Sequence, residues 1–402
     1  MKAIKYGWLL GVLFSLSATA QNVMTSSPYS MFGIGEITTY LSGANAAMGA
    51  TFIGMRGRKL INMNNPAGLT AIDTCSLLAE TSVFARWENY RSAGESHNAF
   101  IGNFSGFSMA GRILLRWYVG VGLSPYSSVG YYFQSSQELE GSPNDYYIST
   151  FLGEGGLSKA YLSNAFLLFP SLSIGVNLGY LFGTITEQES QSSMAISQEL
   201  QGHAFLLDVG LQYTHRFARD LSLTVGAVYG MPQTIQLKRT ELLLENSTYY
   251  TDTKKSIKQE LPQYIGIGTS VEYKKMTYAL DYLFRQYSSL ASEDSRVTFF
   301  DSHELSAGVC YHPNSVGNKI FWKKIDYKLG CAFSTPYYMR VRGQHGYSWR
   351  ITAGLDFPVI NGRVHVAFFY DRVNMEGNMM RRGMPGITVT YTLSELFHRV
   401  RL

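Results

Sequence analysis

The feature that most constrains this chain is an alternation of apolar with small or polar residues, which runs from about residue 75 to residue 396. From Leu172 to Phe182 every second residue is apolar, and mostly Ser, Gly and Asn fill the positions between. Successive side chains of a strand point to opposite faces, so such a segment has one apolar face and one small or polar face. Many such segments in one chain predict a transmembrane β-barrel.

The alternation divides into fourteen segments, and an even number is typical of bacterial single-chain barrels. Short breaks such as Pro170-Ser171 alternate with long polar ones such as 127–158, 188–199 and 239–257, as periplasmic turns alternate with outer loops. One connection, 312–324, is long although it falls on the periplasmic side. We therefore expect an all-β fold, a 14-stranded antiparallel barrel; a soluble secreted β-sandwich is the alternative. The expected strands are 75–89, 97–109, 112–126, 159–169, 172–187, 200–215, 220–238, 258–274, 277–288, 297–311, 325–341, 348–358, 363–373 and 385–396.

Composition agrees with a membrane barrel. Charged residues make up 16% of the chain, below the ~25% of soluble domains, whereas aromatic residues reach 14%. The net charge of +5 is a weak bias and favours no nucleic-acid partner. Aromatic residues gather near the expected strand ends, where amphipathic rings suit the headgroup level. They are Trp87, Tyr90, Trp117, Tyr118, Tyr131, Tyr132, Tyr213, Tyr229, Tyr273, Tyr278, Tyr327, Trp349 and Tyr391.

The start of the chain has the pattern of a secretory signal peptide. Lys2 and Lys5 precede a short apolar run from Trp8 to Leu16, and small residues follow at 18–20. That run is well short of the ~20 residues of a spanning helix. The sequence therefore predicts export to the cell outer membrane of a diderm bacterium. The expected domains are a signal peptide at 1–20, an N-terminal hatch or plug at 21–74, the barrel at 75–396 and a short periplasmic tail at 397–402.

Residues 21–74 show no sustained alternation, and small residues dominate the stretch 42–50. The barrel face opposite the lipid is rich in glycine, which weakens a strand unless another backbone must approach closely. A compact plug inside the lumen would explain both observations; a disordered periplasmic tail is the alternative. The lumen glycines are Gly120, Gly122, Gly175, Gly179, Gly226, Gly230, Gly266, Gly268, Gly308, Gly330 and Gly354.

Several charged residues share the inward parity of these glycines. A charge facing mid-bilayer lipid costs ~2–4 kcal/mol, which favours inward placement and a structural role in joining wall and plug. These residues are Asp208, Glu272, Asp281, Arg285, Arg350, Asp356, His365 and Asp371. The three cysteines, Cys75, Cys310 and Cys331, are interpreted as small wall residues, with a Cys310–Cys331 bridge as the alternative.

The segment before the first strand resembles the hatch of FadL-type long-chain fatty-acid transporters. The matching residues are Ala47 to Ala50, followed by the motif Asn65, Pro66, Ala67, Gly68 and Leu69. This resemblance covers about residues 29–70 in motif and implies fourteen strands with an N-terminal plug. A basic stretch at 56–59 stands where the family has an aspartate-rich one; it could attract an anionic headgroup or meet acids in the lumen.

Two further segments, 28–36 and 122–131, resemble a divergent branch of the family. Related barrels of the PorV type, from the type IX secretion system, serve as partners in protein export. The resemblance thus implies two functions. One is passive, plug-gated diffusion of hydrophobic small molecules such as long-chain fatty acids; the other is a structural or assembly subunit of an outer-membrane protein complex.

The transporter hypothesis names candidate site residues. In the family, ligand leaves the lumen sideways where the third strand kinks, which here implies a lateral-gate strand with Gly120, Gly122 and Pro125, because Pro cannot donate to the ladder. Outer-membrane lipid and a hydrophobic ligand are the expected partners, with a protein partner in the second hypothesis. The candidate ligand-binding residues of the hatch are Met31, Phe32, Ile34, Met48, Phe52, Ile53, Arg56 and Arg58.

An enzyme is the third class of protein considered. The eight histidines are scattered, with neither a paired-His metal motif nor a Gly-x-Ser-x-Gly elbow. A Ser/His site on the barrel wall stays open as an alternative. We expect no catalytic residues, no metal and no cofactor.

Overall fold

A computed structural model describes most of the chain. The described residues are 25–38, 43–92, 95–138, 146–191, 194–245, 248–253, 256–290, 297–313, 320–335, 339–341, 346–375 and 381–396. The expected signal peptide at 1–20 and tail at 397–402 lie outside these residues.

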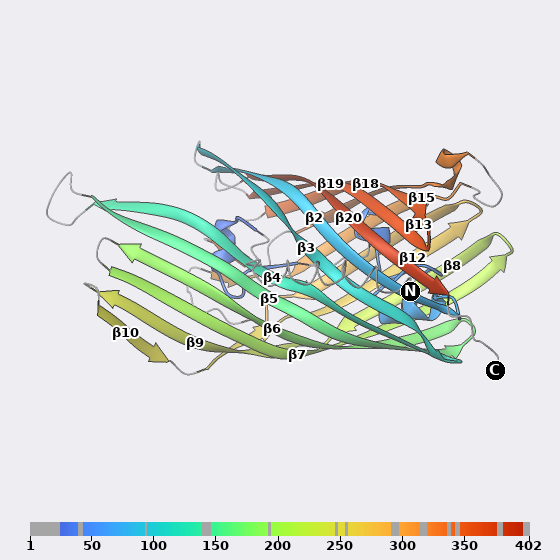
Figure 1. The fold of residues 1–402 in the computed structure, drawn as a ribbon, viewed down its shortest axis with the longest axis horizontal. Coiled ribbons are helices and arrows are strands. Elements are labelled where there is room, and N and C mark those ends of the chain that lie inside the picture. The colour runs from blue at the N-terminus through green and yellow to red at the C-terminus, as the bar shows by residue number, and fades with distance from the viewer. Residues whose placement is uncertain are drawn as a thin grey trace, which may run out of the picture.

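The described residues form a closed antiparallel barrel of 14 strands, in which each strand pairs with its neighbour in sequence and the last, β20, pairs with the first, β2 (Figure 1). This confirms the predicted fold class. Two of the 14 barrel strands are divided into shorter segments. One consists of β8 and β9, and the other consists of β10, β11 and β12. The strands are β2 (Ser76–Ser92), β3 (Glu95–Leu114), β4 (Trp117–Glu138), β5 (Tyr146–Phe169), β6 (Leu172–Gln191), β7 (Met194–Ala218), β8 (Leu221–Gly230), β9 (Gln233–Glu245), β10 (Thr248–Thr253), β11 (Ile257–Leu261), β12 (Gln263–Tyr273), β13 (Met276–Gln286), β15 (Ser302–Tyr311), β16 (Asp326–Ser334), β18 (Gly346–Val359), β19 (Gly362–Met375) and β20 (Arg381–Leu396). A separate pair joins β14 (Val297–Phe299) to β17 (Met339–Val341).

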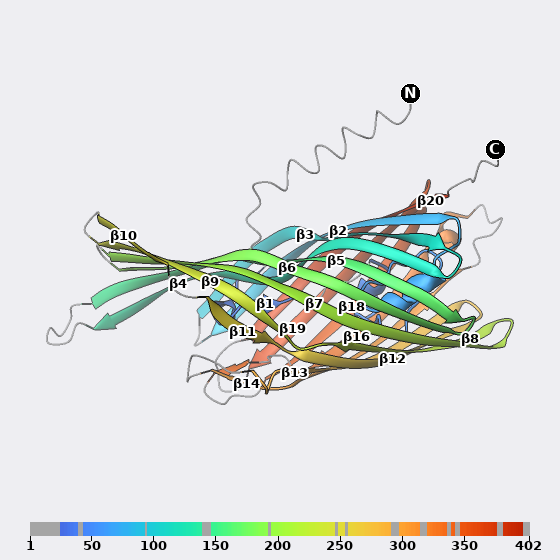
Figure 2. The ribbon, with the colours of Figure 1, turned by 90° about the horizontal axis from the view of Figure 1, so that it is seen from below.

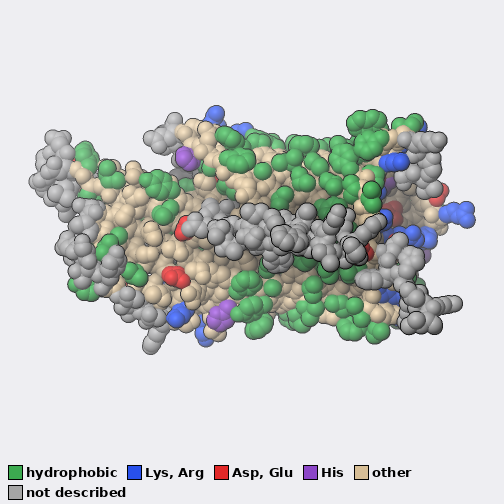
Figure 3. All heavy atoms as spheres, in the orientation of Figure 1, with side chains coloured by type: hydrophobic (Ala, Val, Ile, Leu, Met, Phe, Trp, Pro, Cys, Tyr) green, Lys and Arg blue, Asp and Glu red, His purple; other side chains and the backbone are tan. Residues whose placement is uncertain are grey.

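The wall has an apolar outside, as the alternation predicts. Along β6, Leu178, Tyr180 and Phe182 are exposed on the outer face, whereas Gly179 and Leu181 between them are buried. Figure 3 shows hydrophobic side chains spread over the outer face of the barrel. Among the described residues, no helix is long and apolar enough to cross a membrane.

The strands β4 to β7, β9 and β10 extend well beyond the rest of the barrel at the end opposite the short turns (Figures 1 and 2). The expected long loop at 127–158 is therefore wrong over most of its length, because β4 continues to Glu138 and β5 already begins at Tyr146. Gly153, Gly155 and Gly156 interrupt the alternation of apolar residues in β5. A strand that contains such glycines is hard to recognise from its sequence. The outer loops are thus largely strands.

The described part of the N-terminal segment fills the lumen as a hatch, which contains η1 (Pro28–Met31), β1 (Glu36–Ile37), α2 (Gly43–Ala46) and η2 (Pro66–Ala71). Figure 2 shows it in blue, enclosed by the strands. Its backbone lies directly on the wall glycines: a Cβ at Gly330 would overlap the nitrogen of Gly49, and one at Gly308 would meet the Met48 carbonyl. The glycine-rich inner face thus makes room for the hatch backbone.

The cysteines are all free, so the alternative of a Cys310–Cys331 bridge is wrong. Cys310 is buried on the inner face of β15, whereas Cys331 is exposed on β16 and lies opposite Ala307. Cys75 precedes β2 and is exposed, so it is not a wall residue.

We expect these positions to differ in reactivity. A water-soluble maleimide should modify Cys75 in the folded protein within minutes, because that thiol is exposed at the end of the barrel where the short turns lie. Cys310 should stay unmodified until the barrel is unfolded. Mass spectrometry of digested protein measures both reactions. Rapid labelling of Cys310 in the folded barrel would contradict its place on the buried inner face of β15.

Candidate functional site

The hatch is tied to the wall by buried hydrogen bonds. The Asp281 carboxylate on β13 accepts the backbone N–H groups of Phe52 at 2.5 Å and Ile53 at 2.7 Å. From β7, Gln212 donates its side-chain amide to the Ile53 carbonyl at 2.9 Å. Buried N–H and C=O groups without a partner are costly, so these wall residues fix the path of the hatch.

The hatch motif at 65–69 lies against β5, β6 and β7 rather than beside a cavity. Asn65 caps η2, where its side chain accepts the Ala67 N–H, and Pro66 occupies the first turn. The Asn65 amide also donates to the Ile53 carbonyl at 2.7 Å. The motif therefore shapes the hatch and holds two of its segments together.

Charged wall residues provide a second set of anchors. Arg382 on β20 donates to Glu36 of the hatch at 2.7 Å and to the fully buried Glu88 of β2 at 2.8 Å. Lys328 on β16 donates to the Ala44 carbonyl of α2 at 2.9 Å and pairs with Asp356. The structural role predicted for the lumen charges agrees with these contacts.

The barrel wall parts between β3 and β4. These strands pair only from Phe107↔Leu123 to Leu114↔Trp117. Above this point, the 95–106 part of β3 pairs with β2 alone among the described residues, and β4 continues beside β5. A seam thus opens in the half of the wall away from the short turns.

The hatch takes the place of the missing neighbour along the lower part of this seam. Its β1 pairs with β4 through Glu36↔Ser128, and the Thr38 N–H donates to the Tyr126 carbonyl at 2.8 Å. Farther along, the Ser30 hydroxyl of η1 accepts the Gly130 N–H at 3.0 Å and donates to the Gly130 carbonyl. The exposed edge of β4 is therefore covered by the hatch from about Tyr126 to Gly130.

The predicted gate residues lie on β4 at and below the seam. A register shift between Pro125 and Ser127 marks a bulge at the point where the β3 pairing has ended. Gly120 and Gly122 lie lower, within the paired part, next to Met63 and Tyr161 respectively. Pro125 is therefore the one of the three that lies beside the opening.

Two of the cavities that the described residues form adjoin the hatch. The larger has a volume of about 380 Å³ and the smaller about 110 Å³. Their shared lining includes Ile37, Thr38, Phe52 and Pro125, so both adjoin the hatch strand and the edge of the seam.

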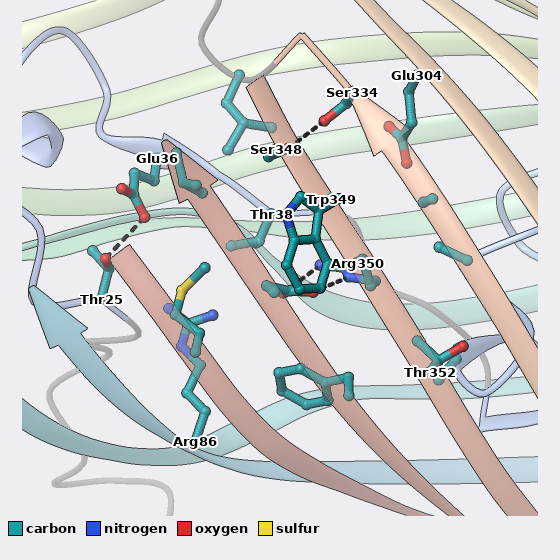
Figure 4. Close-up of a pocket in the computed structure, with 18 of the residues that line it drawn as sticks. Thr25, Glu36, Thr38, Arg86, Glu304, Ser334, Ser348, Trp349, Arg350 and Thr352 are labelled. Atoms are coloured by element: carbon teal, nitrogen blue, oxygen red, sulfur yellow. Dashed lines mark hydrogen bonds and ion pairs between the residues drawn. The ribbon is translucent and has the colours of Figure 1, made fainter. Parts of the chain in front are cut away.

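The larger cavity is lined by ion pairs (Figure 4). Arg285 meets Glu304 at 2.9 Å, and Arg350 holds Asp371 at 2.6 and 2.9 Å in a bidentate pair. The smaller cavity combines the apolar side chains of Met63, Leu206 and Leu283 with polar ones. Those polar side chains are Tyr126, Tyr161, Tyr264, Tyr287, Lys159, Asp208 and Arg285.

The structure does not bring the candidate ligand-binding residues of the hatch together. Ile34 and Met31 pack in an apolar cluster beneath the extended strands, Met48 packs against Met55, and Ile53 against Val228. Of the eight, only Phe52 lines the two cavities.

The two basic candidates lie apart from the cavities. Arg56 donates to the hydroxyl groups of Thr214 at 2.8 Å and Thr70 at 3.1 Å. Arg58 is exposed and lies 3.5 Å from Asp73. Arg56 therefore contacts β7 and the hatch itself, and Arg58 is exposed to solvent. Neither side chain lines one of the two cavities.

Sequence reasoning missed several charged residues of the larger cavity: Glu36, Arg86, Glu304 and Arg382. Glu304 shares the inward parity of Gly308, so the strand pattern contained the signal. Glu36 lies in the hatch, which has no periodicity to interpret. Arg382 lies within the expected connection between the strands 363–373 and 385–396, three residues before the second strand.

Comparison with solved structures gives the same fold. The structure is similar to a FadL homologue of Pseudomonas aeruginosa, with a TM-score of 0.63 and 12% identity over 90% of this chain and 99% of that chain. It is also similar to the toluene transporters TodX of Pseudomonas putida (TM-score 0.60, 13% identity, 90% and 99% covered) and TbuX of Ralstonia pickettii (0.59, 13%, 89% and 98%). No curated protein matches the sequence.

The protein is an outer-membrane β-barrel whose fold is similar to that of the FadL homologue. A family model described as BamG matches residues 4–393, and the chain belongs to this family. Among the described residues, no cluster of three His, Cys, Asp or Glu is arranged to hold a metal ion.

Proposed function

We propose that this protein lets hydrophobic or amphipathic small molecules diffuse passively between its lumen and the outer-membrane lipid through the seam between β3 and β4. One observation carries the proposal: Pro125 lines both cavities and lies where β4 has lost its pairing with β3. A molecule in either cavity thus lies next to the break in the wall. The similarity of the structure to two toluene transporters supports the same class of cargo.

The cavity chemistry favours molecules with a polar end. Apolar groups fit the smaller cavity, which Met63, Leu206 and Leu283 line, whereas Arg285 connects it to the ion pairs of the larger one. A long-chain fatty-acid-like compound has both parts. Its headgroup would meet Arg285 or Arg350 rather than the basic stretch at 56–59, because neither Arg56 nor Arg58 lines a cavity.

The hatch supplies the gate in this proposal. Its β1 occupies the β4 edge through the pairs Glu36↔Ser128 and Ile37↔Ser127, so cargo can cross the lower seam only when β1 leaves that edge. The contact is two residue pairs long, and such a short edge strand is weakly held compared with the wall.

A disulfide across the gate tests the proposal. In a variant with the native cysteines replaced, Ile37→Cys and Ser127→Cys lie directly opposite each other. We expect oxidation to slow uptake of a radiolabelled long-chain fatty acid, and of toluene, at least tenfold in cells that lack the native copy. Reduction with dithiothreitol should restore uptake, because only the release of β1 is blocked.

A control disulfide leaves the gate alone. Ala307→Cys, with the native Cys331 retained, joins two wall strands that are paired along their whole contact. Its oxidation should leave uptake unchanged. Equal uptake with the hatch disulfide oxidised or reduced would contradict the proposed route.

The second candidate function is a structural or assembly subunit of an outer-membrane protein complex, similar to PorV-like barrels. The extended sheet favours it, because β4 beyond Gly130 has β5 as its one strand partner among the described residues. An edge with unpaired backbone groups can accept a strand of another chain. A stoichiometric protein partner purified from native membranes would support this function, whereas a barrel that migrates alone would count against it.

A further inference from the structure

The connection between β15 and β16, which is long for a periplasmic turn, ends in a short helix, η3 (Phe321–Lys324). Figure 1 draws it in orange at the end of the barrel where the short turns lie. Large apolar side chains are exposed around it: Trp322 is 64% exposed, Phe321 54% and Ile320 51%. Such a cluster on a turn needs a partner, because exposed apolar patches mark interaction sites.

Contacts with the wall place η3 on its lipid-facing side. The Phe321 ring stacks on that of Phe357, 6.5 Å between centroids, and Phe357 shares the outward parity of the exposed Ile351 on β18. The Tyr327 hydroxyl, outward on β16, donates to the Trp322 carbonyl at 3.2 Å. The helix thus lies over outward side chains and continues the apolar outer surface of the barrel.

The level of η3 along the barrel matches the headgroup region. Exposed tyrosines occupy the same end of the neighbouring strands, Tyr273 on β12, Tyr278 on β13 and Tyr311 on β15, and Tyr327 pairs directly with Tyr311. Aromatic rings in such a row mark the membrane–water interface of a barrel. Trp322 therefore lies where lipid headgroups begin.

Four lysines lie at this level, together with the carboxylates of Glu272 and Asp326. Lys323 and Lys324 belong to η3, and the exposed Lys274 and Lys275 form the adjacent turn, whose backbone accepts the His312 N–H. Hydrogen bonds to Asp326 and then to Cys310 raise the pKa of His312 to about 10, so His312 and Asp326 form an ion pair and the free positive charge comes from the lysines. Figure 3 shows Lys and Arg side chains gathered at this end of the molecule.

We propose that η3 is an interfacial anchor that inserts Phe321 and Trp322 into the periplasmic leaflet and selects anionic phospholipid through Lys323 and Lys324. A short segment that combines exposed aromatic residues with lysines binds a membrane surface through apolar burial plus attraction to anionic headgroups. The occupant is lipid rather than a periplasmic protein, because the helix folds back onto the lipid-facing wall.

Tryptophan quenching in vesicles tests this anchor. A variant that keeps Trp322 alone of the five tryptophans is reconstituted in mixtures of phosphatidylcholine and phosphatidylglycerol, one of which carries brominated acyl chains. We expect brominated lipid to remove more than half of the Trp322 emission, and aqueous iodide to remove little. At equal mole fraction, brominated phosphatidylglycerol should quench at least twice as strongly as brominated phosphatidylcholine.

Charge removal separates lipid selection from simple insertion. Lys323→Gln with Lys324→Gln should bring the ratio of the two quenching efficiencies to about one. The matched control, Lys238→Gln with Lys258→Gln, removes two exposed lysines from β9 and β11, away from the short turns, and should leave the ratio unchanged. Equal quenching by both lipids in the parent protein overturns the anionic preference. Quenching by iodide but not by brominated lipid overturns the anchor.

Discussion

Gly330→Leu should abolish the folded barrel, with at least a tenfold loss of the compact, heat-modifiable form on unboiled gels. The inward position on β16 touches the hatch backbone at Gly49, and even a Cβ there has no room. Overpacking of a well-packed interior costs ~1–3 kcal/mol where side chains can adjust, and backbone on both sides of this contact cannot adjust in that way. The hatch and the wall then cannot both keep their positions.

The adjacent residue provides the control for this substitution. Cys331→Leu adds bulk to the same strand on the outer, exposed face and should leave the folded yield unchanged. A Gly330→Leu protein that folds at full yield and keeps the hatch protected from protease would show that the close approach at Gly49 is not required.

Asp281→Ala should loosen the hatch while the wall stays closed. The substitution removes the acceptor of two buried backbone N–H groups, those of Phe52 and Ile53. Each unsatisfied group costs ~1–3 kcal/mol, so hydrogen exchange in the hatch should accelerate by a factor of roughly thirty or more. Exchange monitored by mass spectrometry over residues 48–62 measures this directly.

Asp371→Asn is the matched control, because Asp371 pairs with Arg350 on the wall. It should leave exchange in residues 48–62 at the parent rate, although it removes a lumen carboxylate of similar burial. Unchanged exchange in Asp281→Ala would mean that Asp281 is not required to hold this part of the hatch.

The wall of the barrel was predictable because strands that face lipid on one side must repeat with a period of two. Leu172 to Phe182 carries this pattern without interruption, and β6 begins where the pattern begins. The outer parts of β4 and β5 were not predictable in this way. Past about Tyr132 they extend beyond the rest of the barrel (Figure 1), and the alternation of apolar with polar residues that identifies strands disappears.

The presence of a plug was predictable, because the glycines of the inner barrel face need a close backbone neighbour. The contacts of individual hatch side chains were not predictable. Phe52 and Ile53 are adjacent in sequence, yet the first lines both cavities and the second packs against Val228. Irregular chain has no period that says which side chain faces which surface. Pro125 was the one sequence signal for the seam. The extent of the seam depends on the point at which β3 stops pairing with β4, and the sequence does not show that point.

The pairing of β1 with β4 also limits the order in which the molecule can be built. The same N-terminal segment touches β19 and β20 through α2, and β20 closes the ring against β2. A segment enclosed between early and late strands cannot be threaded in after the ring is complete. The N-terminal segment must therefore lie between the early strands before β20 pairs with β2. The machinery that inserts the protein must accordingly bind both ends of the chain at the same time.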